Sequence, residues 1–196
     1  MSPIRILLAE DDTAVAKGYE LILQKAGYKV VGIARDGVEA VSMTQEMKPD
    51  LILMDIKMPR MDGLEAARTI NSSGSESFTP IVLVTAYADQ SLVQKAKSCG
   101  VLGYLIKPVH LDDLVPAVEM AHSAAQKINA LEGVVDNLSE ELEARKLVER
   151  AKGILMKHLQ IEEEEAMRMM QKESRRQRIK LKDLARAIIA SHSVMT

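Results

Sequence analysis

The sequence predicts an α/β domain followed by an all-α tail, and three observations support this fold class. Within the first 125 residues, short apolar runs alternate with amphipathic segments, a pattern typical of parallel strands joined by helices. No proline follows residue 116, and only helical periodicity is present beyond it. The length of 196 residues leaves room for a second, smaller domain. We therefore predict a five-stranded parallel doubly wound domain, a long coiled-coil helix, and a small three-helix all-α domain.

The individual elements follow from the same patterns. Five apolar runs are the predicted strands, and all are expected to be buried: 4–9, 30–34, 51–54, 81–84 and 104–106. Helices are predicted over 13–26, 37–47, 63–71, 89–98 and 111–125. A Ser- and Gly-rich segment, 71–79, predicts a surface loop. Because ligands of such folds collect beyond the carboxyl ends of the strands, the functional residues are expected there.

The long helix is predicted to pair with a second copy of the chain. Its apolar residues recur at alternating steps of three and four: Ala121, Ala124, Ile128, Leu131, Val135, Leu138 and Leu142. We expect a coiled-coil homodimer over 120–145, with packing of this seam onto the chain's own domains as the alternative. Gly133 costs about 1 kcal/mol relative to alanine and weakens the prediction of an unbroken helix. Further helices are expected over 146–158, 162–176 and 181–190.

Composition excludes several classes of protein. Hydrophobic residues make up 47% and charged residues 28% of the chain, as in ordinary globular proteins. No apolar run approaches the roughly 18 residues that cross a bilayer, and the N-terminal segment turns acidic too early for a secretory signal. A cytoplasmic protein without membrane contact is therefore expected. Cys99 is the only cysteine, which excludes a disulfide and a cysteine-based zinc site, and the four scattered histidines indicate no catalytic output domain.

Acidic residues mark the carboxyl ends of two predicted strands. Glu10, Asp11 and Asp12 follow the first strand, and Asp55 ends the third. Two or three carboxylates are therefore expected at one edge of the sheet. Mg²⁺ prefers carboxylate and phosphate oxygens and would relieve their repulsion. An aspartate at such a site can act as a nucleophile and form an aspartyl phosphate.

Four motifs in this region resemble the receiver domain of bacterial two-component response regulators. They are Glu10-Asp11-Asp12, Asp55 within LILMDIKMPRMDG, Thr85-Ala86 within VLVTA, and Lys107-Pro108 within GYLIKP. The resemblance covers about residues 3–125, and we place the domain at 1–125. It implies a cognate histidine kinase as partner, and chemistry limited to the chain's own phosphorylation and dephosphorylation at Asp55.

The resemblance also assigns roles to single residues. It implies a phosphorylation site with four members: Asp55 as phosphoacceptor, Lys107 pairing with the phosphoryl group, Thr85 hydrogen-bonded to it, and Tyr104 as the aromatic side chain that repositions with it. It implies a Mg²⁺ site with oxygen ligands: Asp11 and Asp55, Glu10 through water, and the backbone carbonyl of Lys57. The Lys107-Pro108 bond is implied to be cis.

Basic charge is concentrated in the tail. Residues 146–196 hold 12 Lys and Arg against 7 Asp and Glu, whereas residues 1–125 hold 12 against 16. Seven basic residues fall within 171–186, a density that suits a polyanion, although a solvated helical face is the alternative. With no Trp, one Phe and four Tyr, the chain has little material for stacking unpaired bases on aromatic side chains.

The tail resembles the ANTAR domain, the RNA-binding output module of the AmiR and NasT antitermination regulators. The resemblance rests on RKLVERAKGILM over 145–156, Glu165-Ala166, Lys182-Asp183-Leu184-Ala185 and Ile188-Ile189. It covers about 136–191, within a domain placed at 136–196, and departs at Met167, where the family commonly has an aromatic residue. It implies a dimer, often promoted by phosphorylation, that binds paired leader hairpins and prevents formation of the terminator.

Basic charge and position around the three-helix domain select the candidate RNA contacts: Lys146, Arg150, Lys152, Arg175, Arg176, Arg178, Lys180 and Lys182. Ala151 and Gly153 are interpreted as close-packing residues. Two other outputs stay open. A DNA-binding response regulator would place a recognition helix in the major groove, although no helix-turn-helix spacing is evident. A protein-interaction module could use the glutamates at 162–165 and the methionines.

Overall fold

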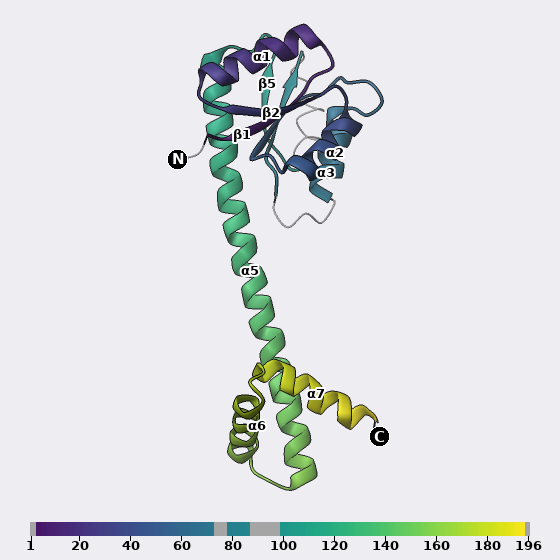
Figure 1. Ribbon diagram of the computed structural model, residues 1–196, viewed down its shortest axis with the longest axis vertical. Helices are drawn as coiled ribbons and strands as arrows, with labels where there is room; N and C mark the ends of the chain where they lie inside the picture. Colours follow the sequence, from purple (N-terminus) through teal and green to yellow (C-terminus); the bar gives the residue numbers. More distant parts are fainter. Residues whose placement is uncertain (1–2, 73–77, 87–98, 195–196) are drawn as a thin grey trace. The chain divides into compact units, whose positions relative to one another are not determined.

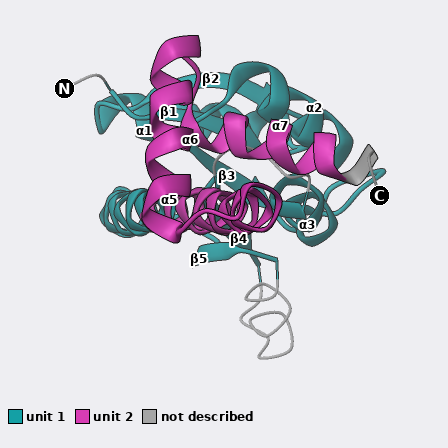
Figure 2. Cartoon of the chain, turned by 90° about the horizontal axis from the view of Figure 1, so that it is seen from below, with its two compact units in different colours: residues 1–130 teal, residues 131–196 magenta. Residues whose placement is uncertain are grey.

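The computed structural model describes residues 3–72, 78–86 and 99–194 of the chain. These form two compact units, a first unit over Met1–Ala130 and a second over Leu131–Thr196 (Figure 2). The predicted helix 89–98 and most of the predicted loop 71–79 lie outside the described residues. Among the helices that are described, none is long and apolar enough to cross a membrane.

The first unit is built on a five-stranded parallel sheet with the order β2-β1-β3-β4-β5. The strands are β1 (Arg5–Ala9), β2 (Lys29–Ala34), β3 (Leu51–Asp55), β4 (Ile81–Thr85) and β5 (Val101–Ile106). The helices α1 (Thr13–Lys25) and the start of α5 (Leu111–Leu159) cover one face, and α2 (Gly37–Met47) and α3 (Gly63–Ser72) cover the other (Figure 1). The predicted doubly wound fold is confirmed.

The central strands are apolar on both faces because both faces are covered. In β1, Ile6 and Leu8 pack with α1 and α5, whereas Leu7 and Ala9 pack with α2 and α3. The prediction that all five strands are buried is wrong for β2 and β5, which are only partly buried. These two strands form the edges of the sheet, so each has a single neighbouring strand and less cover.

The second unit consists of the rest of α5 with α6 (Glu163–Gln177) and α7 (Leu181–Val194). Its small core holds Ala151, Met170, Leu184 and Ala185, with Leu147, Val148, Leu155 and Ile188 among the residues packed against it. Helix α6 starts with glutamates and ends with Arg175 and Arg176, charges that complement its macrodipole. The predicted tail of helices alone is confirmed, and α5 continues unbroken through Gly133.

The predicted heptad seam divides into two parts. Ala121 is buried in the core of the first unit, so the start of the seam packs onto the chain's own domain. Further along α5 the seam positions are each more than half exposed: Leu131, Val135, Leu138 and Leu142. This second part is an apolar stripe without cover in the single chain.

Candidate functional site

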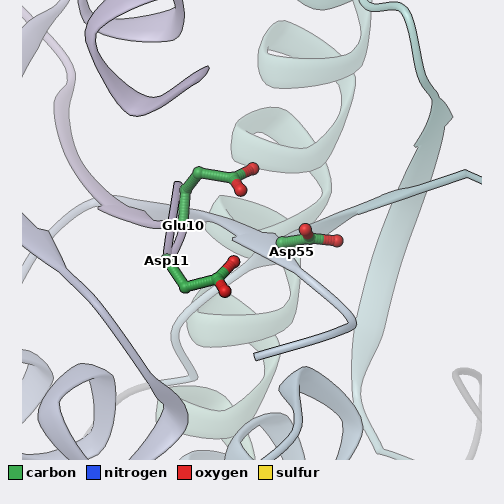
Figure 3. A group of neighbouring side chains, drawn as sticks. All are labelled: Glu10, Asp11 and Asp55. Carbon is green, nitrogen blue, oxygen red and sulfur yellow. The ribbon is translucent and has the colours of Figure 1, made fainter. Parts of the chain in front are cut away.

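Three carboxylates meet at the carboxyl end of the sheet. Strands β1 and β3 are parallel neighbours with Ala9 opposite Met54, so the next residues, Glu10 and Asp55, lie side by side. Carboxylate oxygens of Glu10, Asp11 and Asp55 all lie within 4.8 Å of one another (Figure 3). Glu10 is 2% and Asp55 8% exposed, whereas Asp11 is exposed to solvent. The convergence expected from the strand order is therefore present.

Asp12, which the sequence left as a third member from the first strand, has a different role. Its Oδ1 atom accepts hydrogen bonds from the backbone N–H groups of Ala14 at 2.8 Å and Val15 at 3.2 Å. It is thus the N-cap of α1 and satisfies donors that the first helical turn leaves unpaired. A capping carboxylate is held at the helix start, so the acidic cluster contains only one residue of the Asp11-Asp12 pair.

Lys107 places a cation between two members of the cluster. Its Nζ atom lies 2.7 Å from Oδ2 of Asp55 and 2.9 Å from Oε2 of Glu10. The side chain arrives there because the Lys107 backbone N–H donates to the Thr85 carbonyl at 2.8 Å, just beyond the paired ends of β4 and β5. The Lys107-Pro108 peptide bond is cis, as the resemblance implies.

The pKa values show which charges this arrangement favours. Burial raises the pKa of Glu10 above its ordinary value, and the hydrogen bond from Lys107 only partly offsets this. Burial alone would lower the pKa of Lys107, but hydrogen bonds to Asp55 and Glu10 outweigh it and raise that pKa. The lysine therefore stays positively charged at every physiological pH and counters the negative charge around Asp55.

The loop after β3 is folded tightly against Asp55. The Lys57 N–H donates to Oδ1 of Asp55 at 3.4 Å, and the Gly63 N–H donates to the Ile56 carbonyl at 2.8 Å. A Cβ atom on Gly63 would lie 2.2 Å from the Asp55 carbonyl oxygen. Position 63 therefore tolerates only glycine without a shift of the backbone that carries Asp55. Sequence reasoning missed Gly63, although the Asp62-Gly63 pair was a visible turn signal.

A second contact, also missed from the sequence, ties this loop to α2. The Gly37 N–H donates to the Met61 carbonyl at 3.1 Å, and Arg60 forms an ion pair with Asp36. Asp36 also caps α2 by accepting from the Glu39 N–H at 2.9 Å. Burial alone would raise the pKa of Asp36, but the bonds from Glu39 and Arg60 outweigh it and lower that pKa. The aspartate is thus held ionised at the base of the loop.

The two remaining predicted members lie at different depths. Thr85 is the last residue of β4 and is buried. Since Val84 pairs with Asp55, Thr85 lies one residue beyond that pair at the same edge. Tyr104 pairs with Leu83 instead, two residues short of Thr85, and is 47% exposed on the edge strand β5. The structure therefore brings Thr85, and not Tyr104, to the level of the acidic cluster.

The basic candidates of the tail are mostly on the surface of the second unit. The exposed ones are Lys146, Arg150, Arg175, Arg176, Arg178 and Lys180. Lys146 bonds to Glu143 at 2.9 Å and Arg176 to Glu173 at 2.7 Å, contacts that solvent screens. Lys182 is less exposed and lies 3.6 Å from Glu140.

Lys152 and Gly153 have surroundings that differ from those of the other tail candidates. The Lys152 side chain is 9% exposed, and its Nζ atom lies 2.8 Å from Glu149 and 2.6 Å from Glu163. These hydrogen bonds raise the pKa of Lys152 and join α5 to α6, which favours a role in helix pairing, and its RNA contact stays a prediction. Ala151 is fully buried as expected, but a Cβ atom on Gly153 would meet nothing within 4 Å. Close packing therefore does not explain that glycine.

Comparison with known proteins agrees with both halves of the chain. Residues 6–119 match the response regulator receiver domain family, and residues 136–189 match the ANTAR domain family. The transcriptional regulatory protein PdtaR of Mycobacterium tuberculosis is 43% identical over 187 residues, which span 95% of this chain and 90% of that protein.

Solved structures resemble the first unit. The signal receiver domain of the response regulator NarL from Mycobacterium tuberculosis superimposes with a TM-score of 0.59 at 29% identity, covering 63% of this chain and 98% of that one. The Vibrio cholerae chemotaxis protein CheY4 gives 0.57 at 29% identity, covering 61% and 98%. With a receiver domain carrying a strand-end acidic cluster and an ANTAR domain after it, the chain belongs to the response regulators, among relatives that regulate transcription.

Proposed function

We propose that this response regulator binds paired hairpins in the leader of a transcript and prevents transcription termination when its receiver domain is phosphorylated. The observation that carries the proposal is that one helix, α5, belongs both to the unit with the acidic cluster and to the basic ANTAR unit. An acidic cluster around Asp55 lies in the unit where α5 begins, and a basic ANTAR unit surrounds the end of that helix.

Asp55 is the proposed nucleophile. Its carboxylate attacks the phosphorus of a phosphohistidine on a histidine kinase, so that an O–P bond forms while the P–N bond to the kinase histidine breaks. Lys107 keeps its positive charge beside Asp55 and is positioned to pair with the phosphoryl oxygens. The buried Thr85 at the same edge can offer its hydroxyl to them. The chain's own residues thus supply the nucleophile, the cation and a donor.

The same edge fits a magnesium ion. Carboxylate oxygens within 4.8 Å of one another are hard donors that an oxygen-seeking divalent cation accepts. Asp11 is exposed, which leaves room for the waters that Mg²⁺ retains. We propose Asp11, Asp55 and the Lys57 carbonyl as direct ligands and Glu10 as a ligand through water. The bound ion would neutralise charge on the phosphoryl oxygens.

The exposed half of the seam supports a coiled-coil homodimer. In heptad terms Val135 and Leu142 are a positions, and Leu131 and Leu138 are d positions, all exposed in the single chain. In a parallel pair the flanking g and e positions would place opposite charges together, Lys127 against Glu132 and Glu141 against Lys146 of the second copy. Gly133 falls at the outward f position, where no side chain is needed.

Dimerisation would connect phosphorylation to RNA binding. A dimer presents two ANTAR units, and two linked sites bind paired hairpins more tightly than one through effective concentration. Phosphorylation then needs only to shift the population from monomer to dimer. The exposed basic residues of the second unit, Arg150, Arg175, Arg178 and Lys180 among them, are the proposed phosphate contacts.

The test compares RNA and DNA binding with and without a phosphoryl mimic. In the presence of Mg²⁺ and beryllofluoride, wild type should bind a tandem hairpin RNA more tightly than wild type does without beryllofluoride. It should also bind this RNA more tightly than Asp55→Asn does in the presence of beryllofluoride. Wild type and Asp55→Asn should both bind a duplex DNA of the same sequence weakly at 150 mM salt, with an affinity on the order of that for nonspecific DNA. Preference for the duplex DNA would indicate a DNA-binding regulator instead, and binding to neither would indicate a protein-interaction output.

A further inference from the structure

A cavity of about 450 Å³ that is open to solvent lies on the second unit between α5 and α7. One face of α5 and one residue of α7 line it: Glu149, Arg150, Gly153, Ile154, Lys157, His158 and His192. Its volume is within the range, roughly 300–1,000 Å³, of sites that take a small molecule. None of these residues belongs to the acidic cluster, and only Arg150 was a candidate RNA contact.

Gly153 forms part of the cavity wall, and neither its backbone conformation nor the space around it requires a glycine. It lies inside α5, where glycine costs about 1 kcal/mol relative to alanine. It is absent from the described glycines with positive φ, and a Cβ atom there would meet nothing within 4 Å. Gly18 and Gly133 are equally open, so openness alone indicates nothing. Gly153 differs because it lines a cavity, where a missing side chain lets a ligand reach the helix backbone.

Two histidine rings, those of His158 and His192, also line the cavity. Nε2 of His158 lies 3.0 Å from Nδ1 of His192, and the rings meet edge to face with centroids 4.8 Å apart. They supply flat aromatic surfaces in a chain that has no Trp and one Phe. Histidine rings are among the surfaces on which RNA-binding proteins stack unpaired bases.

The charge of the cavity favours an anion. Arg150 and Lys157 are exposed members of its lining. Glu149 is the acidic member, but its carboxylate already accepts a hydrogen bond from Lys152 at 2.8 Å. Ile154 adds an apolar surface between these groups. Cations, aromatic rings and bare backbone together suit a ligand with a flat ring and a phosphate.

We propose that this cavity receives one unpaired nucleotide from the loop of an RNA hairpin. The base lies against Gly153 and Ile154 beside the histidine rings, and Arg150 and Lys157 bind the flanking phosphates. Hairpin loops present such bases because their nucleotides can be splayed out of the stack, whereas bases in a duplex cannot enter. This inference rests on the proposed RNA-binding function, and it names the place on the second unit where a loop nucleotide is recognised.

The test fills the cavity and uses an equally open glycine of the same helix as control. Gly153→Leu and Gly133→Leu, each in the full chain, are compared with wild type by fluorescence anisotropy. The two probes are a hairpin RNA and its fully paired stem without the loop. Gly153→Leu should bind the hairpin about tenfold more weakly, the scale of one lost base stack, and bind the stem as wild type does. Gly133→Leu should match wild type on both probes.

A second variant keeps the result independent of folding. Gly153→Ala should melt at a higher temperature than wild type, because alanine favours the helix and its Cβ meets no atom, yet bind the hairpin more weakly. A merely structural glycine would not move stability and affinity in opposite directions. Wild-type hairpin affinity in both Gly153 variants would overturn the inference while leaving RNA binding intact. Failure of wild type to bind the hairpin would overturn the proposed function itself.

Discussion

The Nζ atom of Lys107 lies 2.7 Å from Oδ2 of Asp55 and also bonds to Glu10 at 2.9 Å. One ammonium group therefore counters two largely buried carboxylates. Lys107 occupies the side of Asp55 that faces Glu10, and the exposed Asp11 contributes the third carboxylate. The lysine and the proposed divalent cation would thus act on the same negative charge.

Replacing the lysine should strengthen magnesium binding. In Lys107→Ala the carboxylates of Asp55 and Glu10 lose their ammonium partner, so a divalent cation near them meets more uncompensated charge. We expect Mg²⁺ to bind about fivefold more tightly, the scale of one unit charge at about 4 Å in water, as measured by isothermal titration calorimetry. Asp11→Ala should instead weaken binding. Equal Mg²⁺ affinity of Lys107→Ala and wild type would show that the charge of Lys107 does not act on the cation site.

A methyl group at position 63 should damage the proposed phosphorylation site. The Cβ atom of Gly63→Ala would meet the Asp55 carbonyl at 2.2 Å, so the loop must shift at a cost of about 1–3 kcal/mol. Urea unfolding should show this loss, and beryllofluoride should bind less well. The matched control is Gly18→Ala, an open position inside α1, which should gain about 1 kcal/mol. Equal changes in stability and in beryllofluoride binding for both variants would contradict the role of Gly63 in holding the loop that carries Asp55.

Asp36 should make stability depend on acidity. Its pKa lies below the ordinary 3.8, so the carboxylate contributes stability above that value and loses it as pH falls through the folded-state pKa. Asp36→Asn should lower the free energy of unfolding by about 1 kcal/mol at pH 7, a modest loss because Arg60 is largely exposed. The difference from wild type should vanish at low pH. Glu46→Gln, which removes an exposed carboxylate, is the control for the loss of one surface charge.

Much of the fold was predictable because its strands are covered on both faces. The continuous apolar runs of β1, β3 and β4 have few alternatives to a buried strand. The edge strand β5 was predicted from Tyr104, although it begins at Val101. Gly103 interrupts the apolar pattern there, and pairing with β4 extends the strand regardless. The burial of an edge strand depends on tertiary neighbours, which cannot be predicted from the local sequence.

The candidate site was predictable to the same extent. Parallel strands bring their ends together, so the meeting of Glu10 with Asp55 followed from strand order. The capping role of Asp12 did not, because a carboxylate at that point can serve either the cluster or the helix. Lys152 has Glu149 one turn away in the sequence, but its second partner, Glu163, lies across the turn between α5 and α6. Its burial is a tertiary property.

A charge on the exposed seam should abolish dimerisation. Leu138→Asp would place two carboxylates against each other at a d position, where the exposed leucine would otherwise be buried on pairing. Light scattering should report a monomer, also in the presence of Mg²⁺ and beryllofluoride. The control Asn137→Asp adds the same charge one residue away from the seam and should dimerise as wild type does. A wild type that stays monomeric at high concentration would exclude the coiled coil.

Lys152 and Lys180 should separate stability from RNA binding. Lys152→Met removes the hydrogen bonds from a largely buried ammonium group to two exposed carboxylates, one on α5 and one on α6, so it should lower the melting temperature and leave the salt dependence of RNA affinity unchanged. Lys180→Met removes an exposed charge, so it should leave the melting temperature unchanged and reduce the slope of log affinity against log salt by about one. Binding measured at several salt concentrations, alongside thermal unfolding, decides this. A reduced slope in Lys152→Met at temperatures where it is folded would instead support Lys152 as an RNA contact.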